Sequence, residues 1–333
     1  MTDPEQKKRM IDRALARLSP LESCCTLCPR DCRVDRAEGR LGICQTGRRA
    51  AVSHGLLHFG EEPVLSGTSD ASGAAPPETH ARHGSGTIFF AGCNLKCLFC
   101  QNYQLSWLLE GGPVTDEELA EMMLGLQEQG ALNINLVSPT HVILPILRAL
   151  RIACSRGLDL PLVYNSNGYD SLEVLGALDG IIDIYLPDLK YHSSSPSKRY
   201  SGAADYFEKA SQAVLEMSLQ QPVLALDSSG AARRGLIIRH LVLPGYTEDT
   251  LAVLAWVRDN LSPHIGLSLM SQYRPCYKAP AEIQRGVTSA EYRPAAEMAA
   301  TLGLDFLFLQ PGPFGEDEYL IPDFRKEKPF RWK

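Results

Sequence analysis

Three closely spaced cysteines are the side chains of this 333-residue chain that are best suited to chemistry. Cys93, Cys97 and Cys100 form a C-x3-C-x2-C pattern directly after residues 87–91, an apolar stretch typical of a strand. Three thiolates can bind three irons of a [4Fe–4S] cluster and leave the fourth iron without a protein ligand. An open iron can bind a substrate and take part in its chemistry, whereas a fully ligated cluster mostly carries electrons. The pattern therefore predicts a catalytic iron–sulfur site.

Two plainer interpretations of the same run are a structural zinc site and a group of buried cysteines. Zinc would need a fourth ligand, and no His or Cys follows Cys100 within the usual spacing. Structural cysteines without a ligand rarely cluster so closely beside a glycine such as Gly92. The iron–sulfur interpretation is therefore favoured.

A second group of cysteines lies near the N-terminus. Cys25, Cys28, Cys32 and Cys44 give the spacing C-x2-C-x3-C-x11-C, and Cys24 stands directly beside the first of them. Four thiolates suit either a tetrahedral zinc ion or a fully ligated iron–sulfur cluster, and the spacing does not separate the two. Two roles stay open for this group: holding the N-terminal segment over the main domain, and relaying electrons.

The composition indicates a globular protein with a large core and limits the classes of partner. The chain is 44% hydrophobic and 22% charged, and its net charge of -6 argues against a broad nucleic-acid or anionic-membrane surface. It has no apolar run long enough to span a bilayer and no signal-peptide pattern at its start. We expect a cytoplasmic protein, in which the ten cysteines serve as metal ligands before they form disulfides.

The elements that position these cysteines begin with a helix expected at residues 5–18. The cysteine-rich segment follows at 24–44, a strand is expected at 50–60, and the Ser-, Gly-, Ala- and Pro-rich residues 61–86 have the composition of a long loop. This loop marks the join between an N-terminal appendage and the main domain.

From residue 87 onward, apolar strand patterns alternate with helical patterns, which predicts a parallel sheet with crossover helices. About six such units predict an α/β fold, a partial (β/α)6 TIM-like barrel with a Cys-rich N-terminal appendage. The domains are then residues 1–85 (N-terminal helix, metal-binding segment and linker), 86–310 (barrel) and 311–333 (tail). Strands are expected at 87–91, 132–137, 161–165, 181–186, 235–243, 265–270 and 305–309, and helices at 115–129, 141–155, 171–178, 203–219, 248–260 and 289–302.

Polar residues recur where these strands end, and in barrels the loops after the strands carry the chemistry. The runs are Ser-Pro-Thr-His at 138–141, Asn-Ser-Asn-Gly at 165–168, Pro-Asp-Leu-Lys at 187–190, Arg-His at 239–240 and Ser-Gln-Tyr at 271–273. Polar groups gathered at one edge of a sheet more often form a site than arise by accident.

At these residues the chain resembles the radical S-adenosylmethionine (radical SAM) superfamily. Members place C-x3-C-x2-C after the first barrel strand, with an aromatic residue just before the last cysteine, and Phe99 occupies that place. The resemblance implies that Cys93, Cys97 and Cys100 hold a [4Fe–4S] cluster and that Phe99 seats the adenine of SAM. It implies reductive cleavage of SAM and abstraction of hydrogen from a bound target.

Within the superfamily the chain is most similar to the activating enzyme of pyruvate formate-lyase and its relatives. Asp-Leu-Lys at 188–190 resembles their Asp-x-Lys, Asn-Ser-Asn-Gly at 165–168 resembles their Asp-Thr-Asn-Gly, and the run at 239–245 resembles their Arg-Tyr-Val-Val-Val-Pro-Gly strand. Cys-Thr-Leu-Cys-Pro-Arg-Asp-Cys at 25–32 is similar to the Cys-x-Leu-Cys-Pro-Arg-x-Cys motif of an activating-enzyme-like branch. The SAM-binding residues that the resemblance implies are Asn167, Asp188, Lys190 and Arg239.

The same resemblance implies a target and partners. The target is the backbone glycine of a glycyl-radical enzyme, and the electron comes from a flavodoxin- or ferredoxin-type reductant; neither nucleic acid nor membrane is expected as a partner. Two departures set this chain apart, since Pro-Thr-His at 139–141 replaces Gly-Gly-Glu and Asn165 replaces an aspartate. The alternatives are radical SAM modification of another peptide or of a small molecule, and a non-catalytic electron-transfer or metal-binding protein, which would not bind SAM.

Several of these residues also have plain structural interpretations. His141 and Cys276 are weak candidates for a catalytic role, because the first sits at a predicted helix start and the second follows a strand near the predicted mouth of the barrel. His240 is also consistent with a core position, and Cys154 with a small apolar residue in a helix. Asp188 and Lys190 could form a simple ion pair with each other at a strand end.

Overall fold

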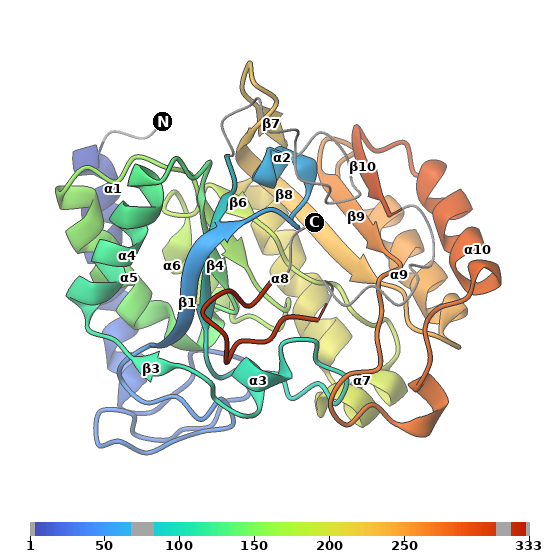
Figure 1. Ribbon diagram of the computed structural model, residues 1–333, viewed down its shortest axis with the longest axis horizontal. Helices are drawn as coiled ribbons and strands as arrows, with labels where there is room; N and C mark the ends of the chain where they lie inside the picture. Colours follow the sequence, from blue (N-terminus) through green and yellow to red (C-terminus); the bar gives the residue numbers. More distant parts are fainter. Residues whose placement is uncertain (1–3, 68–82, 311–320, 331–333) are drawn as a thin grey trace.

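The predicted alternation of strands and helices builds a curved sheet whose central strands are all parallel (Figure 1). The computed structural model describes residues 4–67, 83–310 and 321–330. Each neighbouring pair in the order β2-β4-β5-β6-β8-β9-β10 is parallel, and β10 and β3 form the two edges of an open, partial TIM-like barrel. The strands are β2 (Ser85–Phe90), β4 (Ile134–Val137), β5 (Leu162–Asn165), β6 (Ile184–Tyr185), β8 (Ala232–Leu241), β9 (Gly266–Met270) and β10 (Phe306–Leu309).

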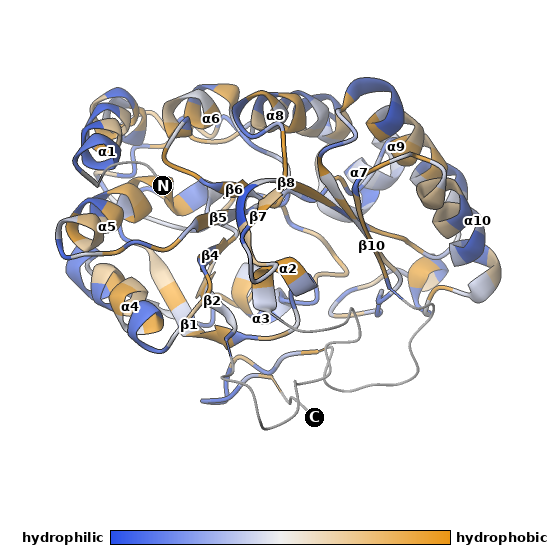
Figure 2. Ribbon diagram, turned by 90° about the horizontal axis from the view of Figure 1, so that it is seen from above, coloured by the Kyte–Doolittle hydropathy of each residue, from blue (hydrophilic) through white to orange (hydrophobic). Residues whose placement is uncertain are grey.

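The helices form an arc around the outside of the sheet (Figure 2). Most begin and end within three residues of the expected positions. Helix α4 starts at a capping box, in which Thr115 and Glu118 bond to each other's backbone N–H groups. Among the longer helices, α7 was not expected from the sequence. The longer helices after the first barrel strand are α4 (Asp116–Glu128), α5 (Ile143–Ser155), α6 (Leu172–Leu178), α7 (Ser194–Ser201), α8 (Tyr206–Gln220), α9 (Thr247–Asn260) and α10 (Ser289–Ala300).

The strand expected at 181–186 is shorter than predicted. The backbone N–H groups of Ile181 and Ile182 both donate to the carbonyl of Leu178, so these two residues complete the turn after α6. Only Ile184–Tyr185 remains free to pair with both neighbouring strands.

The N-terminal residues share the helical layer and the sheet of the barrel. Helix α1 (Pro4–Leu18) packs against α5 and α6, and β1 (Ala51–His58) pairs antiparallel with β2. A short strand, β3 (Gly112–Pro113), pairs with the other side of β1. The domain boundary at residue 85 stays a prediction, but α1 and β1 are continuous with the barrel in packing.

The end of the barrel at which the strands begin is filled by a short helix, α2 (Pro63–Ser66), within the expected loop at 61–86. Leu65 is fully buried with Val163, Ile184 and Ile237 of the inner face of the sheet. The carbonyl of Leu65 also accepts a hydrogen bond of 2.8 Å from the Nδ2 of Asn133 on the segment before β4. Residues 68–82 of the expected loop lie outside the described part.

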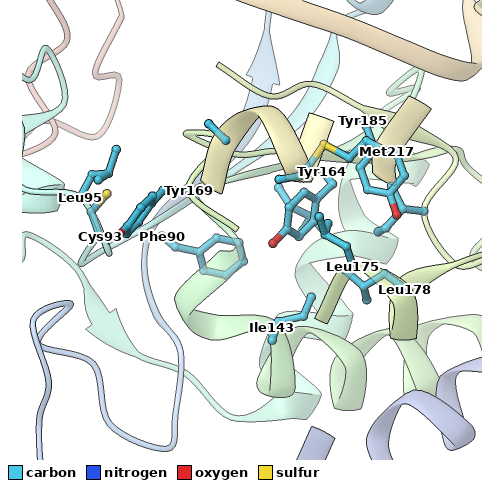
Figure 3. Packing of buried hydrophobic residues seen from close by; sticks show 14 of the residues in the cluster. Phe90, Cys93, Leu95, Ile143, Tyr164, Tyr169, Leu175, Leu178, Tyr185 and Met217 are labelled. Atoms are coloured by element: carbon cyan, nitrogen blue, oxygen red, sulfur yellow. The ribbon is translucent and has the colours of Figure 1, made fainter. Parts of the chain in front are cut away.

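The main core lies between the sheet and the outer helices. Tyr164 and Tyr185 point from β5 and β6 toward Leu175 and Met217 of the helices (Figure 3), and all four are fully buried. The hydroxyl of Tyr185 donates to the Oε1 of Gln220 at 2.5 Å, so its polar end is paired.

A part of the expected tail packs on the sheet. Phe324 and Phe330 contact Phe89 of β2, with ring centroids 5.1 and 5.5 Å away. Residues 311–320 and 331–333 of this tail lie outside the described part. The remaining short elements are η1 (Ser19–Glu22), α3 (Tyr103–Ser106), η2 (Thr140–Val142), β7 (Ala225–Leu226) and η3 (Ala281–Ile283). Within the described ranges, the helices are all too short or too polar to cross a bilayer.

Candidate active site

The cysteines of the C-x3-C-x2-C run and the polar strand ends meet around one cavity of about 350 Å³. This is a size typical of small-molecule sites. The strands are parallel, so their carboxyl ends converge at the same side of the barrel. The cavity also reaches toward α2 at the opposite side, because Glu61 and Glu62 line it as well. The residues predicted for the site that line it are Cys93, Cys97, Phe99, Cys100, Asn167, Asp188, Lys190 and Arg239.

Each cysteine of the run has a different polar side chain next to its sulfur. The Nδ2 of Asn167 donates to Cys93 Sγ at 3.4 Å, and the Oγ of Ser106 donates to Cys100 Sγ at 3.3 Å. The Oγ of Ser201 lies 3.0 Å from Cys97 Sγ. Hydrogen bonds to sulfur are a main means by which a protein fixes and tunes an iron–sulfur site.

Burial raises the pKa of all three thiols. The pKa of Cys93 rises to about 11 and that of Cys100 to about 12, and the pKa of Cys97 moves in the same direction for the same reason. Without a metal these side chains are neutral thiols, so binding iron must displace a proton from each.

The donor set fits a [4Fe–4S] cluster with one open iron. Soft thiolates are the ligands that such clusters require, and among the described residues that line the cavity only these three are cysteines. The remaining polar groups that line it offer oxygen and nitrogen to a second molecule.

Asp188 and Lys190 stand beside the cysteine loop as an ion pair. Burial alone would lower the pKa of Lys190, but the Asp188 carboxylate and the neighbouring Cys97 raise it above its usual range. The hydroxyl of the fully buried Tyr206 lies 2.8 Å from the carbonyl oxygen of Asn167 and 2.9 Å from that of Asp188, so it ties the ends of β5 and β6 together.

A buried carboxylate supports the loop after β5. Asp170 accepts hydrogen bonds from Thr140 (2.6 Å), Tyr164 (2.9 Å) and Ser166 (2.6 Å). Burial nevertheless raises the pKa of Asp170. Thr140 precedes α5, but its hydroxyl donates to this carboxylate, and α5 has no side-chain cap.

Arg239 was expected to bind SAM, but in the structure its guanidinium is paired with carboxylates of the protein itself. Its Nε donates to Glu62 Oε1 at 2.8 Å, its Nη2 donates to Glu62 Oε2 at 2.6 Å, and Nη2 also contacts Glu61. Burial would raise the pKa of Glu61, but Arg239 and His58 together hold it below its usual range. Both carboxylates come from the expected loop at 61–86, where no pattern singled them out.

The two weak catalytic candidates do not line the main cavity. His141 is buried and its Nε2 lies 2.9 Å from the carbonyl oxygen of Ala91; burial lowers its pKa to about 4, so it is neutral. Cys276 is also buried and is not among the residues that line the main cavity. His240 is a core residue, with its Nδ1 2.6 Å from the carbonyl of Leu189.

The aromatic side chain predicted to seat adenine lies in an aromatic wall. Phe99 meets Tyr273 and Tyr200 edge to face, with ring centroids 5.5 and 6.3 Å apart. Tyr273 lines the same cavity as Phe99. The wall leaves an apolar surface next to the cysteine loop.

The four N-terminal cysteines also come together. Cys25, Cys28, Cys32 and Cys44 line one small cavity of about 10 Å³, while Cys24 is exposed and does not line it. Burial raises the pKa of Cys28 to about 12. In the described part of the chain, no three His, Cys, Asp or Glu side chains are grouped closely enough to hold a single metal ion.

Comparisons with known proteins agree with the cysteine pattern. The family model of the radical SAM superfamily matches residues 87–257, about half of the chain. The chain is 31% identical over 296 residues to the uncharacterized protein MJ0674 of Methanocaldococcus jannaschii, covering 85% of this chain and 76% of the relative. It is 26% identical over 311 residues to the uncharacterized protein MJ0808 of the same organism, covering 89% and 84%.

Two solved structures are similar in part. SuiB of Streptococcus suis bound to the precursor peptide SuiA has a TM-score of 0.47 and 14% identity, with coverage of 66% of this chain and 46% of SuiB. Native anSMEcpe with bound AdoMet has a TM-score of 0.44 and 12% identity, with coverage of 66% and 61%. The chain thus spans less than two thirds of the length of either structure.

Proposed function

Because the chain belongs to the radical SAM superfamily, we propose that it cleaves SAM reductively and abstracts hydrogen from a bound target. A [4Fe–4S] cluster, when bound, supplies the electron for this cleavage, and the radical that results takes the hydrogen. The observation that carries the proposal is the convergence of three cysteines, each with a polar neighbour at its sulfur, on the cavity that Asp188 and Lys190 line.

The side chains of this chain hold and orient the reactants. Cys93, Cys97 and Cys100 bind the cluster, and the hydrogen bonds at their sulfurs fix the positions of the thiolates. Lys190 and Asp188 offer one charge of each sign beside the cysteines, which suits the carboxylate and ammonium groups of the amino-acid part of SAM. Phe99 supplies the apolar face for adenine, and Asn167 acts through its bond to Cys93.

The target that we propose is the backbone glycine of a glycyl-radical enzyme, with a flavodoxin- or ferredoxin-type protein as the electron donor. This finer proposal rests on the resemblance of residues 165–168, 188–190 and 239–245 to the activating enzymes. Arg239 differs from the role that the resemblance implies, because Glu61 and Glu62 already neutralise it. We further propose that the four N-terminal cysteines bind a second metal centre, since they line one cavity.

The test of SAM cleavage is direct. The protein is reconstituted anaerobically with iron and sulfide, and dithionite and SAM are added. We expect 5′-deoxyadenosine from the unaltered protein and from Cys154→Ala, a change on α5 away from the cavity, and none from Cys97→Ala. A reducible cluster that forms no more 5′-deoxyadenosine than Cys97→Ala does would refute the proposal.

The target is tested with labelled glycine. Extract of the source organism, grown on glycine deuterated at Cα, is separated into protein and small-molecule fractions, and each is incubated with the reconstituted protein and SAM. We expect deuterium in 5′-deoxyadenosine only with the protein fraction. Transfer from the small-molecule fraction alone, or from neither, would exclude a glycyl-radical enzyme as the target.

A further inference from the structure

The cavity of the N-terminal cysteines contains a buried cation without an anionic partner. Arg36 lines this cavity with the four cysteines and is only 3% exposed. Its Nη1 donates to the carbonyl of His141 at 2.9 Å, and its Nη2 contacts the carbonyl of Gly47. Its Nε–H is buried without a hydrogen-bond partner among the described residues. The guanidinium is thus only partly satisfied by backbone carbonyls, and it shares its cavity with the four thiols.

A buried guanidinium is costly unless negative charge lies close to it. Within the described part of the chain, Arg36 forms no ion pair with a carboxylate. The groups in its cavity that can become anions are the thiols of Cys25, Cys28, Cys32 and Cys44. A metal centre held by four thiolates keeps a net negative charge, and its sulfur atoms accept hydrogen bonds. The Arg36 guanidinium therefore matches a bound thiolate centre.

The spacing of these thiols distinguishes between the two candidates, a zinc ion and an iron–sulfur cluster. A zinc ion sits about 2.3 Å from each of four sulfurs, so its ligands must lie close together. Among the described residues no three His, Cys, Asp or Glu side chains are grouped closely enough to hold a single metal ion, and this includes the four thiols that line this cavity. The wider spacing suits a cluster in which each thiolate binds its own iron.

We propose that Cys25, Cys28, Cys32 and Cys44 hold a second, fully ligated iron–sulfur cluster, with the Nε–H of Arg36 donating to its sulfur. The inference rests on the proposal that these cysteines bind metal, and it does not depend on SAM cleavage. With a protein ligand on every iron, this cluster leaves no iron open to SAM.

The second cluster lies against the loop of the first. Arg36 donates to the carbonyl of His141, whose ring contacts the carbonyl of Ala91, two residues before Cys93. The Nε of Arg30 also donates to the carbonyl of Asn94 at 2.7 Å. A Cβ added to Gly92 would come within 2.6 Å of the carbonyl oxygen of Cys44, so the two loops are in direct contact. The N-terminal cluster thus anchors residues 91–94.

The first experiment removes the cysteines of the C-x3-C-x2-C run, so that only the N-terminal cysteines can bind a cluster. The triple variant Cys93→Ala, Cys97→Ala, Cys100→Ala is purified and reconstituted anaerobically, and its iron, sulfide and zinc are measured, with an electron paramagnetic resonance spectrum after reduction. We expect about four irons and four sulfides per chain, as for a [4Fe–4S] cluster, and the signal of a reduced cluster. Adding Cys28→Ala should abolish both, whereas adding Cys154→Ala should leave both unchanged.

Zinc in place of iron would overturn the proposal, as would equal iron in the variant with Cys28→Ala. Absence of any metal in a folded triple variant would also refute the proposal that the N-terminal cysteines bind metal. The proposal of SAM cleavage would not be affected, because it is tested by 5′-deoxyadenosine formation in the unaltered protein. If the triple variant does not fold, the same metal analysis and spectrum of the unaltered protein test the proposal. We expect about eight irons per chain and two reduced-cluster signals, of which SAM changes one; four irons with one zinc would refute the cluster.

The role of Arg36 is tested by measuring the reduction potential of the N-terminal cluster. In the triple variant, Arg36→Gln should shift the reduction potential of the N-terminal cluster to more negative values, because a hydrogen bond and a positive charge at sulfur are lost. Arg40→Gln, an exposed change in the same loop, should leave the potential unchanged. An unshifted potential in Arg36→Gln would show that Arg36 does not face the cluster.

Discussion

Gly168 is the position at which a single methyl group should disturb the site most directly. It follows β5 and has a left-handed backbone with φ +78°, a conformation that costs an L-residue about 1–2 kcal/mol. A Cβ there would also lie 2.2 Å from the carbonyl oxygen of Asp188 and 3.1 Å from the hydroxyl of Tyr206. Both neighbours are fixed, one by the backbone and one by its hydrogen bonds, so forcing them apart adds about 1–3 kcal/mol.

Gly303 provides the matched control, since its φ is +71° and no heavy atom lies within 4 Å of an added Cβ. Gly303→Ala should therefore cost only the backbone strain of about 1–2 kcal/mol, and Gly168→Ala should lower the free energy of unfolding by about 1–3 kcal/mol more. The difference between these two variants isolates the contact with Asp188.

The assay is urea unfolding of the anaerobically reconstituted proteins, with midpoints compared at a common slope. Because the added methyl pushes on the strand end that carries Asp188 and Lys190, Gly168→Ala should also bind SAM more weakly, and Gly303→Ala should not. Equal losses of stability in the two variants would refute the close approach of the loops after β5 and β6.

Three further predictions concern other parts of the site. Burial lowers the pKa of His240 in the folded state, so its neutral ring stabilises the protein fully above the unfolded pKa of about 6.5, and this contribution is lost as the pH falls. The urea midpoint should therefore be lower at pH 5.5 than at pH 7.5, and His240→Asn should not show this part of the loss. Glu62→Ala should lower the free energy of unfolding by about 3 kcal/mol, because it leaves the buried Arg239 with only one carboxylate; a loss below about 1 kcal/mol in urea unfolding would contradict this. Ser201→Ala should shift the potential of the cluster bound by Cys97 to more negative values in a redox titration, and no shift would show that its hydroxyl does not act on the sulfur.

Local sequence determined the elements and the cysteine loop. The spacing of apolar residues and the signals at helix ends depend on neighbours within a few residues, so the sequence predicted the positions of most strands and helices closely. The capping box at Thr115 is such a local signal. The run Cys93 to Cys100 is equally local, because its chemistry depends on spacing alone. The strand ends that carry Asp188 and Lys190 followed from the parallel order of the strands, and the structure gathers them around one cavity.

The partners of those residues depended on contacts between distant parts of the chain. Arg239 meets Glu62 across 177 positions, and Ser201 meets Cys97 across 104, and no local pattern encodes either pairing. The same holds for Arg36, whose burial against His141 is visible only once residues 105 positions apart have folded together. The sequence by itself therefore determined which groups could do chemistry. Only the tertiary structure decided which of them are already neutralised, which sulfurs receive hydrogen bonds, and which buried guanidinium has no carboxylate beside it among the described residues, because these depend on the distance between side chains in space.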